Sequence, residues 1–322
     1  MSTELTELKR HLGAKSPPIR YEIDEGSIQY FADSIMDPDS RYHCPPSSPS
    51  CQPPGLVAPP TFFGSATGLR GVAAGDASTM SALDLPFPRG WMTIATGDVF
   101  EFYEPIRSGM TLISRERLVD VREKLGRSGR LIFYTIEKVF ANPEGAPVLK
   151  RMLYCAAREP NPVTVGVRPG TPQTPGPVLT CGSIPTLTAG PITVRYLAMF
   201  ATATAEFVDI HYDADFARSL GLPGPIIQGL YKTALVARML KDWLGDGSLI
   251  RSLAVEHRGM DLAGAVLTVG GAVTLDLNVT GTACVDCSVW VRNQHGIVTT
   301  SGSARVVPPT GTSTESIHHR HN

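Results

Sequence analysis

An acidic side chain and a histidine stand close together in "EFVDIHYDADFARSLGLPGPIIQG", residues 206–229, just ahead of the apolar run "LYKTALVARMLKDWL". Glu206 and His211 are five residues apart, and a turn rich in Gly and Pro follows them. A carboxylate and an imidazole that hold one water can act together as a general acid–base pair. The stretch is therefore either a proton-transfer site beside a helix terminus or an acidic loop that leads into a core helix.

The segment after Gly229 predicts a deeply buried helix. Apolar side chains cover most of one side of it, and few polar positions interrupt them, among them Lys232 and Arg238. Two strand–turn–strand hairpins with "NPEG" and "NQHG" turns, and strand entrances at Gly109 and Gly264, complete a pattern of one helix followed by antiparallel strands. This pattern predicts an α+β architecture, in which a sheet covers one face of the helix.

The pattern occurs twice along the chain. "FADSIMDPDSRYH" from Phe31 matches "FATATAEFVDIHYD" from Phe200, which places Asp37 opposite Glu206 and Tyr42 opposite His211. In each half a Pro-rich turn follows, "GLVAPPTFFG" in the first and "GLPGPIIQG" in the second. The segment "HCPPSSPSCQPPG", residues 43–55, is interpreted as an insertion in the first half, and residues 158–191, dense in Pro, Gly and Thr, as the linker between the halves.

Composition excludes several classes of protein. The chain has 322 residues, a net charge of −1 and no basic stripe, which argues against a nucleic-acid partner. The charged start "MSTELTELKRHLGAK" is unlike a signal peptide, and no apolar run is long enough to span a membrane, so we expect a cytoplasmic protein. The six cysteines are expected to be reduced, and Cys284-x-x-Cys287 is interpreted as part of a strand and not as a zinc site.

Residues 206–230, together with "YEIDEGSIQYFADSIMDPDSRY" and "VAPPTFFG" in the first half, resemble the MaoC-like (R)-specific enoyl-CoA hydratases and 3-hydroxyacyl-thioester dehydratases. The resemblance covers most of the chain and implies a double hotdog, in which each unit wraps an antiparallel sheet around a long central helix. The pattern of this family has Asp, Asn and Pro where Glu206, Val208 and Asp209 stand here, and it shares His211.

The resemblance implies roles for individual residues. Glu206 would be the catalytic base, and His211 would orient the water and relay its proton. Gly229, at the first turn of a helix with free N–H groups, would stabilise the thioester oxyanion. Gln228 and Ile227 would line the substrate site, and Asp209 is a secondary candidate for the base.

The expected organisation is an N-terminal hotdog in residues 1–157 that shapes the acyl pocket, the linker 158–191, a C-terminal MaoC-like hotdog in residues 192–308 and a disordered tail in 309–322. We expect no metal or cofactor, an acyl-CoA or acyl-carrier thioester from lipid metabolism as substrate, and either a homodimer or a second hotdog subunit as partner. Two alternatives stay open. One is a non-catalytic subunit or acyl-thioester-binding module, which the altered motif favours; the other is a thioesterase, because hotdog folds host that reaction as well.

Overall fold

The computed structural model describes residues 2–43, 55–63, 83, 85–87, 91–126, 129–158, 182–279 and 282–309. The first half contains α1 (Thr3–Arg10), β1 (Ile19–Glu22), α2 (Glu25–Ser34), β2 (Met92–Phe102), β3 (Thr111–Gly126), β4 (Gly129–Ala141) and β5 (Pro147–Arg158). The second half contains β6 (Gly182–Ala189), α3 (Val194–Thr204), the 3-10 turn η2 (Asp209–His211), α4 (Ala214–Ser219), α5 (Gly229–Leu244), β7 (Leu249–His257), β8 (Leu267–Val279), β9 (Thr282–Asn293) and β10 (Val298–Val307). Few helices and a large antiparallel sheet confirm the predicted α+β class.

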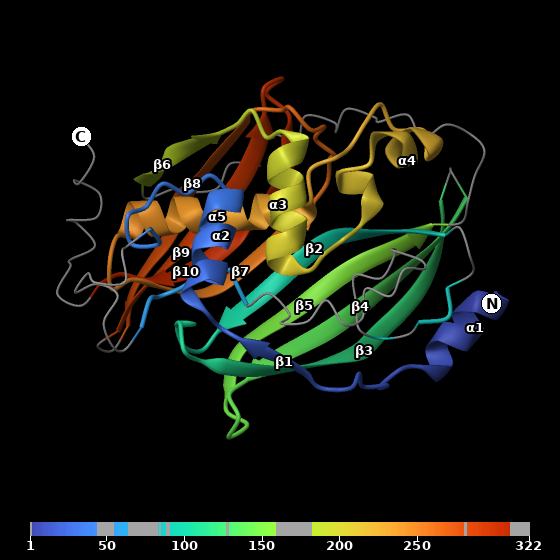
Figure 1. Cartoon of the computed structure of the whole chain (residues 1–322), viewed down its shortest axis with the longest axis horizontal. Helices are drawn as coiled ribbons and strands as arrows, with labels where there is room; N and C mark the ends of the chain where they lie inside the picture. Colours follow the sequence, from blue (N-terminus) through green and yellow to red (C-terminus); the bar gives the residue numbers. More distant parts are fainter. Residues whose placement is uncertain are drawn as a thin grey trace.

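The ten strands in the described part of the chain form one sheet with the order β1-β3-β4-β5-β2-β7-β10-β9-β8-β6. Read inward from either end, the order is the same in the two halves, and β2 and β7 join the halves as an antiparallel pair. Figure 1 shows the second-half strands, together with β2, curving around α5, with α2 and α3 side by side in front of that helix. The strand arrangement is that of the double hotdog that the resemblance implied. The predicted central helix of the first unit, which the 169-residue spacing would place opposite α5, lies largely outside the described residues.

Backbone hydrogen bonds confirm the register of the duplication. Ile23 donates to Met110 and accepts from Gly109, and Ile192 likewise donates to Ala265 and accepts from Gly264. Ile192 follows Ile23 by 169 residues, the same spacing that separates Glu206 from Asp37 and His211 from Tyr42. Equivalent side chains also meet between α2 and α3, where the rings of Phe31 and Phe200 lie 5.6 Å apart.

The same spacing shows that residues 43–55 are not an insertion. An isolated bridge pairs Val57 with Arg107 in the first half, and another pairs Ile226 with Leu262 in the second. Val57 follows Tyr42 by the same number of residues as Ile226 follows His211, so the two connections are equally long. Their different composition gave a false impression of extra length.

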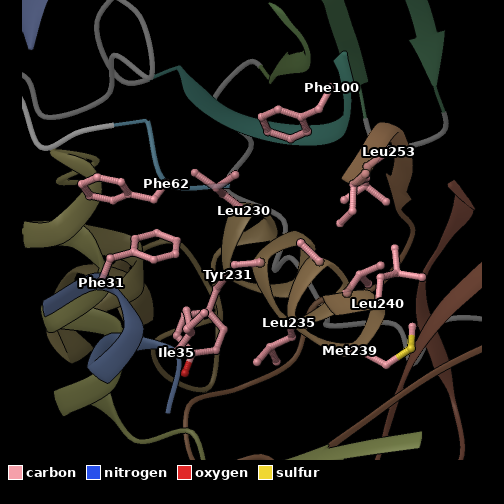
Figure 2. Close-up of a cluster of buried hydrophobic side chains, with 14 of the residues drawn as sticks. Phe31, Ile35, Phe62, Phe100, Leu230, Tyr231, Leu235, Met239, Leu240 and Leu253 are labelled. Atoms are coloured by element: carbon pink, nitrogen blue, oxygen red, sulfur yellow. The ribbon is translucent and has the colours of Figure 1, made fainter. Parts of the chain in front are cut away.

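The buried face of α5 forms the centre of the core, as its apolar pattern predicted. Twelve of its sixteen residues are buried. Figure 2 shows Leu230, Tyr231, Leu235, Met239 and Leu240 of this helix beside Phe31, Ile35 and Phe62 of the first half and Phe100 and Leu253 of the joining strands. Because α5 is covered by residues from both halves, each Leu or Phe here stabilises the contact between the halves by roughly 1.5–3 kcal/mol.

Two local predictions have different outcomes. The hairpins are confirmed: β4 and β5 turn at Gly145, and β9 and β10 turn at Gly296, both with positive φ. The end of the expected linker, however, is a strand, because residues 182–189 form β6 at the sheet edge. An edge strand tolerates Pro185, whose position coincides with a register shift against β8. Residues 159–181 and the expected tail from residue 310 onward lie outside the described residues.

Three of the six cysteines lie among the described residues, and all three are free thiols. Cys284 and Cys287 lie in β9 as free thiols, and burial raises the pKa of Cys287 to about 12. Within the described ranges, no helix is both long and apolar enough to cross a membrane.

Candidate active site

The candidate residues lie on the connection between α3 and α5. α3 ends at Thr204, and Ala205 adopts a left-handed conformation with φ 56°, which turns the chain away from the helix axis. Glu206 follows, and η2 then carries Asp209 and His211. Asp213 caps α4 by accepting hydrogen bonds from two backbone N–H groups. Short capped turns therefore fix the loop.

His211 is held in one tautomer. Its Nδ1 donates to the carbonyl oxygen of Ile226 over 2.8 Å, and a carbonyl can only accept. Burial lowers the pKa of His211 to about 4, and the bond to Ile226 offsets this shift in part. The imidazole is therefore neutral at physiological pH, and its Nε2 carries a lone pair that can accept a proton.

Glu206 interacts with charges of the first half of the chain. Burial raises the pKa of its carboxyl, the positive charges of Arg151 and Lys138 oppose that shift, and Asp98 adds to it. The residue retains partial solvent exposure. Among the described residues, no hydrogen bond or ion pair joins Glu206 to His211 directly. The structure thus brings both to one loop, and any joint action requires a molecule between them.

The three candidates at the start of α5 are placed differently. Ile227 is a core residue, and its backbone N–H donates to Asp261. Gln228 is buried and its side-chain amide donates to the carbonyl oxygen of Leu197 in α3, while its Oε1 has no partner among the described residues. Gln228 gives α5 no side-chain cap, so the first N–H groups of the helix keep their capacity to donate.

Gly229 is in close contact with a histidine. A Cβ at this position would lie 2.6 Å from Cδ2 and 2.7 Å from Nε2 of His257. The imidazole of His257 thus occupies the space that a side chain at position 229 would need. Arg258, the next residue, is half exposed and pairs with Glu256.

Asp209 is engaged locally. Its Oδ1 accepts a hydrogen bond of 2.9 Å from the hydroxyl of Tyr212, which raises the pKa of Tyr212 together with burial. This bond gives Asp209 a side-chain partner, whereas within the described ranges no hydrogen bond or ion pair holds the carboxylate of Glu206.

Three further polar residues lie beside these candidates and were not predicted as site residues. Asp98 in β2, Arg151 in β5 and His257 in β7 are all buried, and Arg151 Nε donates to Asp98 Oδ1 over 2.6 Å. The sequence held a signal for Arg151, because it shares the alternation of β5 with the buried Leu149 and Leu153. A charge at an inward position of a strand indicates a buried ionic site.

The corresponding region of the first half lacks the same chemistry. The hydrogen bond from Ala58 to Ile106 matches that from Ile227 to Asp261, so Pro59 and Pro60 stand where Gln228 and Gly229 stand in the second half. Proline has no N–H and cannot act as an oxyanion donor. Burial raises the pKa of Tyr42 far above its ordinary value, so Tyr42 does not replace the imidazole of His211.

Asp37, opposite Glu206, is also enclosed by charges. It lies 3.7 Å from Arg238 of α5, and burial raises the pKa of its carboxyl. Its oxygens, with those of Asp39 and Asp242, lie within 4.8 Å of one another, but Arg238 and Arg41 already pair with this group.

A pocket with about 550 Å³ of open space lies at the C-terminal end of α5. Its lining includes Pro59, Pro60, Phe102, Lys241 and Arg251, and none of the six candidate residues. It thus lies where the two halves meet, next to the proline pair, and does not include the loop that carries Glu206 and His211.

Comparison with known proteins assigns both halves to described families. Residues 10–151 match the FAS1-like dehydratase domain region, and residues 183–289 match the MaoC-like domain. A UPF0336 protein of Thermobifida fusca is 28% identical over 142 residues, which cover 44% of this chain and 86% of that protein. The 3-oxo-4,17-pregnadiene-20-carboxyl-CoA hydratase beta subunit of Mycobacterium tuberculosis is 33% identical over 79 residues, 24% of this chain and 61% of that subunit.

Solved structures share the fold at low sequence identity. A MaoC-like dehydratase aligns with a TM-score of 0.69 and 18% identity over 94% of this chain and 100% of that one. A Mycobacterium tuberculosis protein described as having a double hotdog fold aligns with a TM-score of 0.56 and 11% identity over 92% of this chain and 96% of that one. The chain therefore combines a FAS1-like dehydratase domain region in its first half with a MaoC-like domain in its second, and it shares the double-hotdog fold with these solved structures.

Proposed function

We propose that this protein hydrates 2-enoyl-CoA thioesters to (R)-3-hydroxyacyl-CoA, or catalyses the reverse dehydration. The observation that carries the proposal is the neutral imidazole of His211, fixed by its bond to Ile226 beside the start of α5. The similarity to the mycobacterial hydratase subunit, whose name includes a CoA thioester, supports a CoA thioester as substrate. That relative is a subunit by name, which also supports a second hotdog chain as partner.

The proposed reaction uses one water molecule. Glu206 accepts a proton from the water as its oxygen forms the bond to C3, and the π electrons of the double bond move toward the thioester carbonyl. The resulting enolate oxygen is stabilised by the free N–H groups at the start of α5, and one such donor contributes about 2.7–4 kcal/mol to lowering the barrier in comparable sites. Glu206 then delivers this proton to C2. Throughout, the Nε2 lone pair of His211 accepts a hydrogen bond from the water and orients it.

A non-catalytic, thioester-binding role is the alternative. It is favoured by the departure of residues 206–211 from the family pattern, in which Val208 and Asp209 replace Asn and Pro. In addition, the carboxylate of Asp209 accepts a hydrogen bond from the hydroxyl of Tyr212.

The test is an absorbance assay on short, long, branched and ring-bearing enoyl-CoA substrates. His211→Asn keeps the donor to Ile226 but removes the Nε2 lone pair, and it should lower kcat by about 10²–10⁴-fold. Tyr42→Phe, at the matching position of the first half, should leave kcat within about two-fold of the parent, since its ring packing is kept. Equal losses from both changes would contradict the asymmetry, release of free thiol would indicate a thioesterase, and binding without turnover would indicate the non-catalytic role.

A further inference from the structure

A buried polar network surrounds the side chain of Asp261, which lies between β7 and β8. Its Oδ2 accepts a hydrogen bond of 2.6 Å from the hydroxyl of Thr299 and one of 3.2 Å from Lys232 Nζ. Its Oδ1 accepts a bond of 3.1 Å from the side-chain amide of Asn293. Lys232 also donates to the carbonyl oxygen of Gly259, and the side chains of Lys232 and Asp261 are 2% and 0% exposed. Residues of α5, β9 and β10 thus fix this carboxylate in one place.

One peptide unit connects Asp261 with His211. The N–H of Ile227 donates to the carbonyl oxygen of Asp261 over 2.8 Å. The carbonyl of Ile226 belongs to the same peptide unit as that N–H, and it accepts from His211 Nδ1 over 2.8 Å. A trans peptide unit is planar, and its N–H and C=O point in opposite directions. Asp261 therefore holds one edge of the unit and His211 is bound to the other, so a rotation of the unit away from Asp261 moves the acceptor of His211 as well.

The first half of the chain builds the same backbone arrangement with apolar side chains. Two successive N–H groups after β7 donate to the carbonyl oxygen of Thr299, and two after β2 donate in the same way to Val148. The matching bonds and the 169-residue spacing define three buried, apolar counterparts: Val148 for Thr299, Ile106 for Asp261 and Phe63 for Lys232.

Stability alone does not account for this difference between the halves. Replacing a buried ion pair by apolar residues of similar volume is often neutral or stabilising, because the pair recovers little more than the cost of its own desolvation. The first half shows that the fold forms with apolar residues at these positions. Of the two copies, the charged one is the copy that is hydrogen-bonded to His211 through the peptide unit.

We propose that Asp261 is a positioning residue for His211. Its carboxylate, held by Lys232 and Thr299, fixes the peptide unit, and that unit holds the imidazole with the Nε2 lone pair directed to the water. The inference rests on the proposed function, in which His211 orients the attacking water. A displacement of about 1 Å in such a group can lower the rate by about 10²-fold, even when the changed residue does not touch the substrate.

The first test is a matched pair of changes at Thr299. Thr299→Val keeps the methyl group that packs on Gly259 but removes the hydroxyl that donates to Asp261, whereas Thr299→Ser keeps the hydroxyl. Thr299→Val should lower kcat by about 10-fold with little change in KM, and Thr299→Ser should recover most of this loss. Lys232→Met/Asp261→Asn should lower kcat by about 10²-fold. Both charges are removed together, because a single change would leave the other one buried and unpaired.

The tautomer of His211 gives a readout that needs no turnover. Nitrogen-15 NMR of the imidazole, assigned by its loss in His211→Asn, should show a protonated Nδ1 and an unprotonated Nε2 in the parent. In Thr299→Val and in Lys232→Met/Asp261→Asn, the population with a protonated Nε2 should rise. This rise would support the positioning role even if the parent hydrates no substrate, in which case the proposed function alone would fail.

Asp37→Asn/Arg238→Met is the matched control. It removes another buried pair that involves α5, but Arg238 binds the carbonyl oxygens of Ile35 and Met36 and not the turn before the helix. The control should leave the His211 tautomer as in the parent, even where it lowers stability as much. An equal tautomer shift in the control would show that lost stability moves the ring. A parental tautomer and parental kcat in both Thr299→Val and the charge-neutral variant, with parental circular dichroism, would leave the network a structural role; either result would overturn the proposal.

Discussion

The partly buried imidazole of His211 should make the folded protein less stable in mild acid. Its pKa is lowered from 6.5 to about 4 in the folded state, because burial disfavours the charged ring. As pH falls below 6.5, the unfolded chain binds a proton that the folded chain does not, so stability is lost until pH falls to the folded value. Above the unfolded value both states are neutral, and His211 then contributes no pH dependence.

The size of the effect follows from the two pKa values. Linkage predicts that the unfolding free energy falls by about 2 kcal/mol between about pH 7.5 and about pH 5. Allowing for the partial exposure of the ring reduces this loss to about 1–2 kcal/mol. His211→Asn removes the titration and keeps a donor for the carbonyl oxygen of Ile226. The difference in unfolding free energy between parent and variant isolates His211 from the carboxyl groups, which titrate in both proteins.

The assay is urea unfolding of both proteins across this pH range, followed by circular dichroism. The parent should lose more stability than His211→Asn on acidification, by the amount above. Parallel pH profiles would show that the ring is solvated or already protonated in the folded state, and the neutral-imidazole argument would then fail.

Two further predictions concern Glu206 and Gly229. Glu206→Gln should lower hydration by about 10²–10⁴-fold. It should not lower the melting temperature, because burial raises the pKa of the carboxyl and the neutral amide removes the cost of burying its charge. A less stable Gln variant would mean that the positive charges of Arg151 and Lys138 outweigh the cost of burial. Gly229→Ala should displace the His257 ring and cost about 1–3 kcal/mol in unfolding free energy. Gly224→Ala is the control, because its added Cβ would meet no atom within 4 Å. Equal melting temperatures of the two variants would refute the close packing at Gly229.

The sequence by itself determined the repeated elements of this protein. Strand alternation, the Gly145 and Gly296 turns and the apolar pattern after Gly229 are local signals, and local propensity together with one buried face is enough to produce a hairpin or a core helix. The spacing that relates Asp37 to Glu206 could also be read directly, because duplicated segments keep their length when they keep their contacts. The sequence did not predict edge strand β6, because Pro185 is a signal against a strand. The strand forms in the fold through hydrogen bonds to its neighbour β8.

Only the tertiary structure decided which residues surround Glu206. Arg151 and Asp98 stand 53 residues apart in the chain, and they meet because β2 pairs with β5. His257 reaches Asp98 because β2 also pairs with β7, the contact that joins the two halves. Likewise, Lys232 interrupts the apolar run of α5 in the sequence, yet in the fold it is buried against Asp261. Such pairings depend on sheet register between distant strands, and a residue's own neighbours in the chain carry no information about that register.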